Sequence, residues 1–199
     1  MAFKGVPFAT MTLLSRKRFV SPLLANEQEK GEGERGSKMV LDSVFRMELS
    51  SNYKRDALCV NIAAPAASGQ VLRLFHVHLD SLNSFYRRIV QMWVLAGALR
   101  ESGCSGGITA GDFNAIYPED HDLVDEHELV DAWVALHGRT TGTNGGATWG
   151  VGRLKPGSRL DKVVMLGLQP NKIEVLQPGL VDARTPWSDH CGLRCTFTI

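Results

Sequence analysis

Paired cysteines, long apolar runs and excess charge of one sign are all missing from this chain of 199 residues. Its four cysteines form no Cys-x-x-Cys pair and no zinc-type spacing, which argues against a structural zinc site and predicts free thiols. No apolar run approaches the roughly 20 residues of a membrane helix, and no secretory signal pattern begins the sequence. We therefore expect an intracellular protein without a membrane span.

The formal net charge is only +1, so the charge total gives no general attraction for polyanions. Any affinity for nucleic acid must come from a local cleft. A composition of 44% hydrophobic and 22% charged residues is typical of soluble globular proteins, and the length suits one domain over residues 1–199. Residues 24–38 are rich in Gly, Glu and Lys without apolar periodicity, which predicts a flexible surface loop.

Short β-type runs dominate the pattern. Strands are predicted at residues 8–14, 39–49, 57–63, 71–79, 107–110, 160–166, 172–176 and 192–199. Residues 85–100 follow a helical period instead, which places Trp93 and Leu99 on the apolar face and Arg88 and Gln91 elsewhere. Many strands, few helices and no regular βαβ alternation predict an α+β fold, with two packed sheets in a β-sandwich flanked by helices.

Two polar motifs follow apolar strands directly. His76 and His78 are two residues apart on one strand face, where they could hold a metal or be structural histidines; we expect a structural role for His76 and a functional one for His78. After Gly111, Asp112 and Asn114 project to the same side. An acceptor beside an amide donor could orient water against a phosphate, although an ordinary turn is the alternative.

Two further motifs lie near the C-terminus. Asp161 opens a strand, either as an exposed partner of Arg159 or as a carboxylate that orients a catalytic histidine. Asp189 and His190 are adjacent in a segment before the last strand, so their side chains point in different directions. One could bind a hard cation while the other contacts a phosphate. Each motif alone is a weak signal.

Taken together and in this order, His-x-His-Leu-Asp-Ser, Gly-Asp-Phe-Asn, Thr-Trp-Gly, Arg-Leu-Asp and Ser-Asp-His resemble the signature of the endonuclease/exonuclease/phosphatase superfamily. The pattern is most similar to the tyrosyl-DNA phosphodiesterase 2-like branch. This resemblance implies a deoxyribonuclease I-like fold, metal-dependent hydrolysis of phosphodiester bonds at DNA 5′ ends, and nuclear residence.

The resemblance also implies catalytic roles. Asp112 would orient or deprotonate the attacking water, and Asn114 would bind the phosphate. His78 and His190 would contact the non-bridging oxygens and stabilise charge in the transition state. Asp161 would hold His190 in its working orientation.

The remaining implied roles concern the metal and the substrate. Asp189 would bind Mg²⁺ (or Mn²⁺), and the substrate-binding residues would be Ser81, Trp149 and Arg159. The partner would be a DNA end or another phosphate-ester substrate.

Two departures from the family pattern leave alternatives open. The family begins with a strand–helix–strand unit that supplies an asparagine and the glutamate that is the principal Mg²⁺ ligand, and we expect the domain to lack this unit. Ala115 and Ile116 also follow the Gly-Asp-Phe-Asn motif where the branch carries an arginine. The alternatives are an inositol-phosphate or sphingomyelin-type phosphoesterase, or a non-catalytic truncated remnant that binds a phosphorylated ligand or a protein.

Overall fold

A computed structural model describes residues 9–21, 38–64, 69–139, 145–151 and 157–198. The flexible loop predicted at residues 24–38 lies, apart from Lys38, outside the described residues. None of the described helices is long and apolar enough to cross a bilayer. The four cysteines are free, as expected, with Cys59 and Cys191 buried and the other two half-buried.

Within the described residues, seven strands form the larger sheet. In spatial order they are β1 (Phe19–Val20), β2 (Met39–Glu48), β3 (Asp56–Ala63), β4 (Val71–His78), β5 (Cys104–Asp112), β7 (Asp161–Leu166) and β6 (Val130–Asp131). The pairs β1–β2 and β4–β5 are parallel and the other pairs are antiparallel. A second sheet consists of the antiparallel strands β8 (Gln169–Leu176) and β9 (Gly192–Thr198). The predicted α+β class with two sheets is confirmed.

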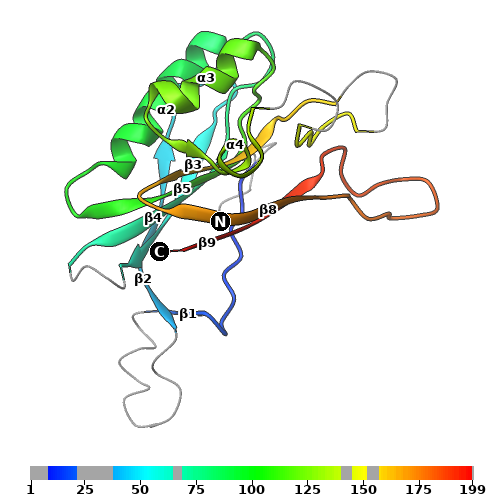
Figure 1. The fold of residues 1–199 in the computed structure, drawn as a ribbon. Helices are drawn as coiled ribbons and strands as arrows, with labels where there is room; N and C mark the ends of the chain where they lie inside the picture. Colours follow the sequence, from blue (N-terminus) through cyan, green and yellow to red (C-terminus); the bar gives the residue numbers. More distant parts are fainter. Residues whose placement is uncertain (1–8, 22–37, 65–68, 140–144, 152–156, 199) are drawn as a thin grey trace.

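The helices are α2 (Phe85–Leu99), α3 (Pro118–Glu126) and α4 (Ala132–His137). Helices α2 and α3 cover one face of the larger sheet, and the second sheet lies with α4 on the other (Figure 1). Phe75 and Val77 of β4 pack with Met92 and Leu95 of α2 in one apolar cluster. Residues of β8 and β9 contribute to a second cluster with β5 and β7. Because side chains alternate along a strand, His76 and His78 point to the face that lacks α2.

The predicted strand at residues 8–14 is wrong for its described part, because residues 9–14 form no strand. Side chains of the sheet bind this segment in place of a ladder of backbone hydrogen bonds. Arg46 Nη2 donates to the carbonyl of Thr10 at 2.6 Å, and His76 Nδ1 lies 2.9 Å from the carbonyl oxygen of Met11. His76 therefore has the structural role that we expected.

Helix α2 is predicted correctly in extent, but its buried face differs from the one expected. Trp93 is 68% exposed, whereas Arg88 and Gln91 are buried. Arg88 makes two hydrogen bonds to the carboxylate of Asp120 in α3, at 2.6 and 2.8 Å. Gln91 bonds Asp80 through both its amide oxygen and its amide nitrogen. These partners satisfy the polar groups that burial would otherwise leave unpaired.

Two acidic residues, Asp120 and Asp131, fix the starts of helices. Asp120 accepts from the backbone N–H of Tyr117 at 2.9 Å, and Pro118 occupies the first turn of α3. Asp131 caps α4 by accepting from the backbone N–H groups of Trp133 and Val134. Both carboxylates are buried.

Strands β4 and β5 approach each other closely at Gly111, just before the C-terminal end of β5. Gly111 has φ of +135°, and a Cβ there would lie 2.0 Å from the carbonyl oxygen of Val77. Only glycine fits this backbone position, which immediately precedes Asp112. The register then sets His78 beside Asp112, and Asp112 beside Asp161.

Candidate active site

Three predicted residues meet because the sheet topology brings three strand ends to one edge. His78 is the last residue of β4, Asp112 is the last of β5, and Asp161 is the first of β7. Since β4 and β5 are parallel and β7 runs antiparallel to β5, these termini are adjacent. The strands hold the three side chains on a rigid support.

His190 joins this edge from the segment before β9. The segment is tied to the Thr-Trp-Gly motif, because Cys191 N donates to the carbonyl of Thr148 at 2.6 Å and Trp149 forms a β-bridge with His190. The backbone N–H of His190 also donates to Ser188 Oγ at 3.0 Å. As a result, His190 Nδ1 lies 2.7 Å from Asp161 Oδ2.

The Asp161 carboxylate controls the protonation of His190. Burial lowers the pKa of His190, but the hydrogen bond and the charge of Asp161, with the charges of Asp112 and Asp189, outweigh it and raise the pKa above its ordinary value. Asp161 accepts from Nδ1–H, which directs Nε2 away from the carboxylate. His190 is therefore an oriented donor that binds a proton more readily than an ordinary histidine.

His78 and Asp112 form the second histidine–carboxylate pair, with His78 Nε2 3.4 Å from Asp112 Oδ2. Burial, followed by the charges of Arg55 and His190, lowers the pKa of His78 to about 4. Burial, together with the charge of Asp161, raises the pKa of Asp112. At neutral pH the site thus holds a neutral imidazole beside a carboxylate that binds a proton more readily than usual.

Asn114 fixes the turn that follows β5. Its φ is +47° and it is buried. The backbone N–H donates to Asp112 Oδ1 at 2.8 Å, and Nδ2 donates to the carbonyl of Leu79 at 2.9 Å. Asn114 therefore holds Asp112 against the end of β4. This contact stabilises the turn, and the phosphate contact predicted for Asn114 stays a prediction.

The remaining predicted residues differ in whether their side chains lie near His190. Trp149 Nε1 donates to Asp189 Oδ2 at 3.2 Å, so these two side chains lie together next to His190. Ser81 is half-buried in the segment between β4 and α2. Arg159 points elsewhere, because its Nη1 donates to Asp131 Oδ2 at 2.6 Å.

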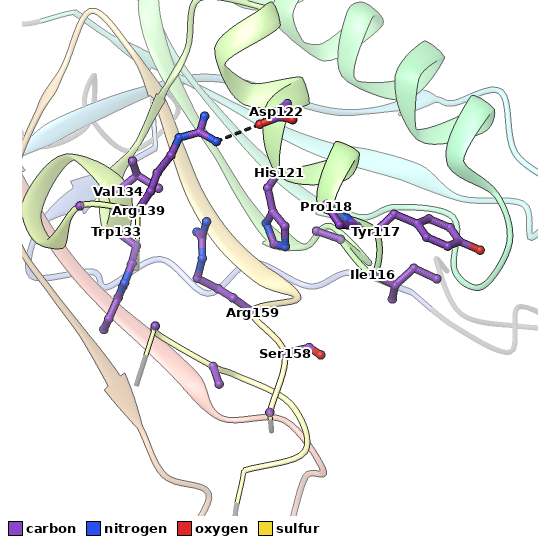
Figure 2. Close-up of a pocket in the computed structure, with 15 residues that line it drawn as sticks. Ile116, Tyr117, Pro118, His121, Asp122, Trp133, Val134, Arg139, Ser158 and Arg159 are labelled. Atoms are coloured by element: carbon purple, nitrogen blue, oxygen red, sulfur yellow. Dashed lines mark hydrogen bonds and ion pairs between the residues drawn. The ribbon is translucent and has the colours of Figure 1, made fainter. Parts of the chain in front are cut away.

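Arg159 lines a neighbouring pocket of about 510 Å³ together with side chains of α3 and α4 (Figure 2). His121 and Trp133 are among the lining residues, and Arg139 at the rim pairs with Asp122. The lining includes none of the four residues His78, Asp112, Asp161 and His190. The four catalytic candidates thus lie outside the lining of this pocket.

No family model and no curated protein matches the sequence, but solved structures match the fold. TDP2 from D. rerio, solved with a single-strand DNA product, shares 20% identity over 81% of this chain and 69% of that one, with a TM-score of 0.62. An endonuclease/exonuclease/phosphatase protein from Bacteroides vulgatus shares 17% identity over 85% of this chain and 62% of that one, with a TM-score of 0.58. A mannosyl-6-phosphatase from Bacteroides thetaiotaomicron shares 16% identity over 81% of this chain and 67% of that one, also with a TM-score of 0.58.

The chain has the endonuclease/exonuclease/phosphatase fold. The resemblance inferred from the motifs is therefore confirmed at the level of the fold. The similar structures include proteins named as a phosphatase and as an endonuclease/exonuclease/phosphatase.

The described residues of this chain do not fit a divalent metal by themselves. Asp189, the predicted Mg²⁺ ligand, accepts from Trp149. Over the described ranges, no group of three or more His, Cys, Asp or Glu side chains could hold an ion. Mg²⁺ requires near-octahedral oxygen coordination, so Asp189 needs further ligands.

Sequence reasoning missed two charged residues at this edge. Burial lowers the pKa of the Arg55 guanidinium, while the carboxylates of Asp80 and Asp112 raise it, so a cation faces the candidate general base. Asp80 is fully buried, accepts from Ser51 Oγ, and accepts from the backbone N–H of Asn52 at 2.8 Å. It ties the turn before β3 to the end of β4. Asp80 belongs to the His-x-His-Leu-Asp-Ser motif, but no role was predicted for it. Arg55 belongs to no strand-end motif, so the sequence pattern gives no signal for it.

Proposed function

We propose that this chain hydrolyses phosphate esters, with a phosphodiester at a DNA 5′ end as the preferred substrate. The observation that carries the proposal is the convergence of two histidine–carboxylate pairs, His78–Asp112 and Asp161–His190, from four separate segments. A phosphate ester needs both a proton acceptor for water and donors for its oxygens, and these pairs offer one acceptor and two donors.

Asp112 is the proposed proton acceptor. Its raised pKa makes it a better base than an exposed aspartate, and the Asn114 N–H and the charges of His190 and Arg55 limit this rise. In the proposed reaction, the water oxygen bonds to phosphorus as Asp112 takes the proton. The phosphorus–oxygen ester bond breaks, and the released oxygen takes a proton from solvent.

His190 and His78 are the proposed donors to the non-bridging oxygens. His190, with its pKa raised by Asp161 against the effect of burial, carries positive charge where negative charge develops on the phosphoryl group. His78, whose pKa is about 4, donates as a neutral imidazole and adds no charge. The two rings therefore supply one cation and one neutral donor.

A DNA end is the substrate favoured within this class. The support comes from the motif resemblance and from the fold shared with TDP2, whose structure contains a single-strand DNA product. A phosphomonoester is the second candidate, supported by the fold shared with a mannosyl-6-phosphatase. Any requirement for Mg²⁺ is part of the proposal, and Asp189 would be one ligand among others.

The test is hydrolysis of a 5′-phosphotyrosyl oligonucleotide by the purified chain, with Mg²⁺ or with EDTA. Asp112→Asn removes the proton acceptor with little change in shape, so a decrease of about 100-fold or more is expected. Asp42→Asn is the matched control, because the Asp42 side chain bonds its neighbour Ser43 on β2, away from the candidate site.

The outcomes separate the candidates. Tyrosine release that is lost in Asp112→Asn and kept in Asp42→Asn supports the DNA-end substrate. Cleavage of sugar phosphates without tyrosine release shifts the assignment to the second candidate. If the folded protein releases neither product with Mg²⁺ or Mn²⁺, the hydrolase proposal is wrong and the alternative is a phosphate-binding protein.

A further inference from the structure

The segment between β8 and β9 folds into an ordered turn that projects from the body of the molecule (Figure 1). Leu180 and Pro186 form a β-bridge, and Val181 N donates to the carbonyl of Thr185 at 2.8 Å. Asp182 Oδ1 closes the tip by accepting from the backbone N–H groups of Arg184 and Thr185, both at 2.9 Å. The projecting turn therefore has a defined shape.

Trp187 lies at the base of this turn with most of its ring in solvent, because its exposed fraction is 71%. The backbone N–H of Trp187 donates to the carbonyl of Gly179 at 3.0 Å. A Cβ added to Gly179 would meet ring atoms Cη2 and Cζ3 of Trp187 at 3.0 Å, so the indole lies directly against this glycine. Contact with Gly179 supports the ring while leaving most of it accessible.

The position of Trp187 links this ring to the candidate active site. Ser188, Asp189 and His190 follow it immediately, and Ser188 Oγ accepts from His190 N–H. Three residues of extended chain span at most about 11 Å. Successive nucleotides of a stacked strand are about 3.4 Å apart. The backbone at Trp187 is thus within about 11 Å of the backbone at His190, which is the length of about three stacked nucleotides.

We propose that Trp187 is a stacking platform for a nucleobase next to the scissile phosphate, so that this chain acts on single-stranded nucleic acid ends. The inference rests on the hydrolase function proposed above and names its substrate class. A supported, exposed indole beside a phosphate site has the form of the aromatic platforms that bind bases through their faces.

The same turn fits a lipid surface poorly. Its tip consists of Asp182, Ala183 and Arg184, and both charged residues are exposed. Entry into a bilayer would remove their water shells without providing new partners. A stacked base would contact only the indole at the base of the turn and would leave the tip in water.

The test measures binding of a 5′-phosphorylated, dye-labelled single-stranded oligonucleotide by fluorescence anisotropy. This ligand is a product analogue, so binding is read without turnover. Trp187→Ala should weaken binding by about 5- to 100-fold, and Trp187→Phe should recover part of the loss. Leu180→Ala is the matched control, because Leu180 is 60% exposed in the same turn, and it should bind as the wild type does.

An oligonucleotide with abasic sites at the three nucleotides next to the 5′ phosphate separates stacking from phosphate binding. The wild type and Trp187→Ala should bind this ligand equally. Equal binding of the two proteins to the intact oligonucleotide would overturn the proposal. So would equal losses in Trp187→Ala and Leu180→Ala, which would mark the turn as a general apolar docking surface.

A base-free phosphodiester distinguishes failure of this inference from failure of the hydrolase proposal. Its cleavage at the same rate by the wild type and Trp187→Ala, together with the predicted binding difference, supports both. The same cleavage with no binding difference overturns the role of Trp187 and leaves the hydrolase intact. A binding difference without cleavage of any phosphate ester supports the platform and contradicts hydrolysis.

Discussion

The Nδ1 atom of His190 lies 2.7 Å from Oδ2 of Asp161, although 29 residues separate the two in the chain. This contact joins the segment before β9 to the first residue of β7. It also fixes which nitrogen of His190 faces away from the sheet. The Ser-Asp-His segment is thereby positioned by the larger sheet, even though it leads into the smaller one.

Removal of the Asp161 charge should lower the pKa of His190. Asp161→Asn keeps the shape of the side chain but loses the charge that outweighs burial. The measurement is an NMR pH titration of the His190 ring in both proteins. Asp189→Asn is the control, because Asp189 contributes less to the His190 pKa than Asp161 does. An unchanged titration in Asp161→Asn would contradict the assigned pairing.

The same pair gives a pH dependence of stability. The folded-state pKa of His190 is above the unfolded value of about 6.5, so the folded protein holds this proton more tightly. The stabilisation is present in full below about pH 6.5 and is lost as the pH rises through the folded pKa. The difference in Tm between wild type and Asp161→Asn should therefore be larger at about pH 5.5 than at about pH 8.5.

His121 should make the fold sensitive to acid. Burial, followed by the charges of Lys162 and Arg159, lowers its pKa to about 4. Its Nδ1 lies 2.9 Å from Lys162 Nζ, so the neutral ring accepts from the ammonium group. The unfolded chain takes up this proton near about pH 6.5 and the folded chain only near about pH 4. The free energy of unfolding should therefore decrease as the pH is lowered from about 6.5 to about 4.

His121→Gln tests this origin of acid sensitivity. Glutamine can still accept from Lys162 through its amide oxygen, but it has no proton to gain. Denaturant unfolding at about pH 7 and about pH 4.5 should show a smaller loss of stability in His121→Gln than in the wild type. Equal losses in the two proteins would show that other groups cause the acid sensitivity.

Motifs at strand ends predicted the candidate site because the pairing register of β4, β5 and β7 brings their ends together, independently of the loop conformations. His78, Asp112 and Asp161 could be found in this way. The direction in which the Arg159 side chain points could not be predicted, because its partner Asp131 lies at the start of a helix, 28 residues away in the chain. Such pairings depend on tertiary packing, and the sequence pattern around each residue carries no information about them.

The buried face of α2 shows the same limit. Helical periodicity gave its extent, but hydrophobicity alone placed Trp93 inside and Arg88 outside. Arg88 is buried because Asp120, 32 residues further along the chain, neutralises it. The strand expected at residues 8–14 failed for a related reason, because Arg46 and His76 supply side-chain contacts where a ladder was expected.

The buried Arg88–Asp120 pair should be costly to break on one side. Both side chains are 1% exposed, and Arg88→Met would leave the Asp120 carboxylate buried without its cation. We expect a loss of about 3–5 kcal/mol in the free energy of unfolding, measured by urea denaturation. Arg139→Ala breaks exposed ion pairs with Asp122 and Asp125 and should change the midpoint much less.

A double substitution tests whether the loss comes from the unpaired charge. Arg88→Met combined with Asp120→Leu removes both charged groups from the interior. This variant should be more stable than Arg88→Met alone, because no carboxylate remains buried without a partner. A double variant less stable than either single one would show that packing, rather than charge, dominates at this contact.

Gly111 should be a glycine at which a single methyl group affects both fold and site. Its φ of +135° is unfavourable for any L side chain, and a new Cβ would lie 2.0 Å from the carbonyl oxygen of Val77. Gly111→Ala must separate β4 from β5 next to the point where His78 pairs with Asp112. We therefore expect a loss of at least about 2 kcal/mol in the free energy of unfolding, measured by urea denaturation.

Gly97→Ala is the matched control for this substitution. Gly97 is exposed on α2, and no atom lies within 4 Å of the point that a Cβ would occupy. Alanine there should stabilise the helix by about 0.5–1 kcal/mol, because glycine loses more backbone entropy on folding. Hydrolysis is then measured under conditions where Gly111→Ala is still folded. A folded Gly111→Ala protein with full activity would show that the β4–β5 spacing does not position the catalytic candidates.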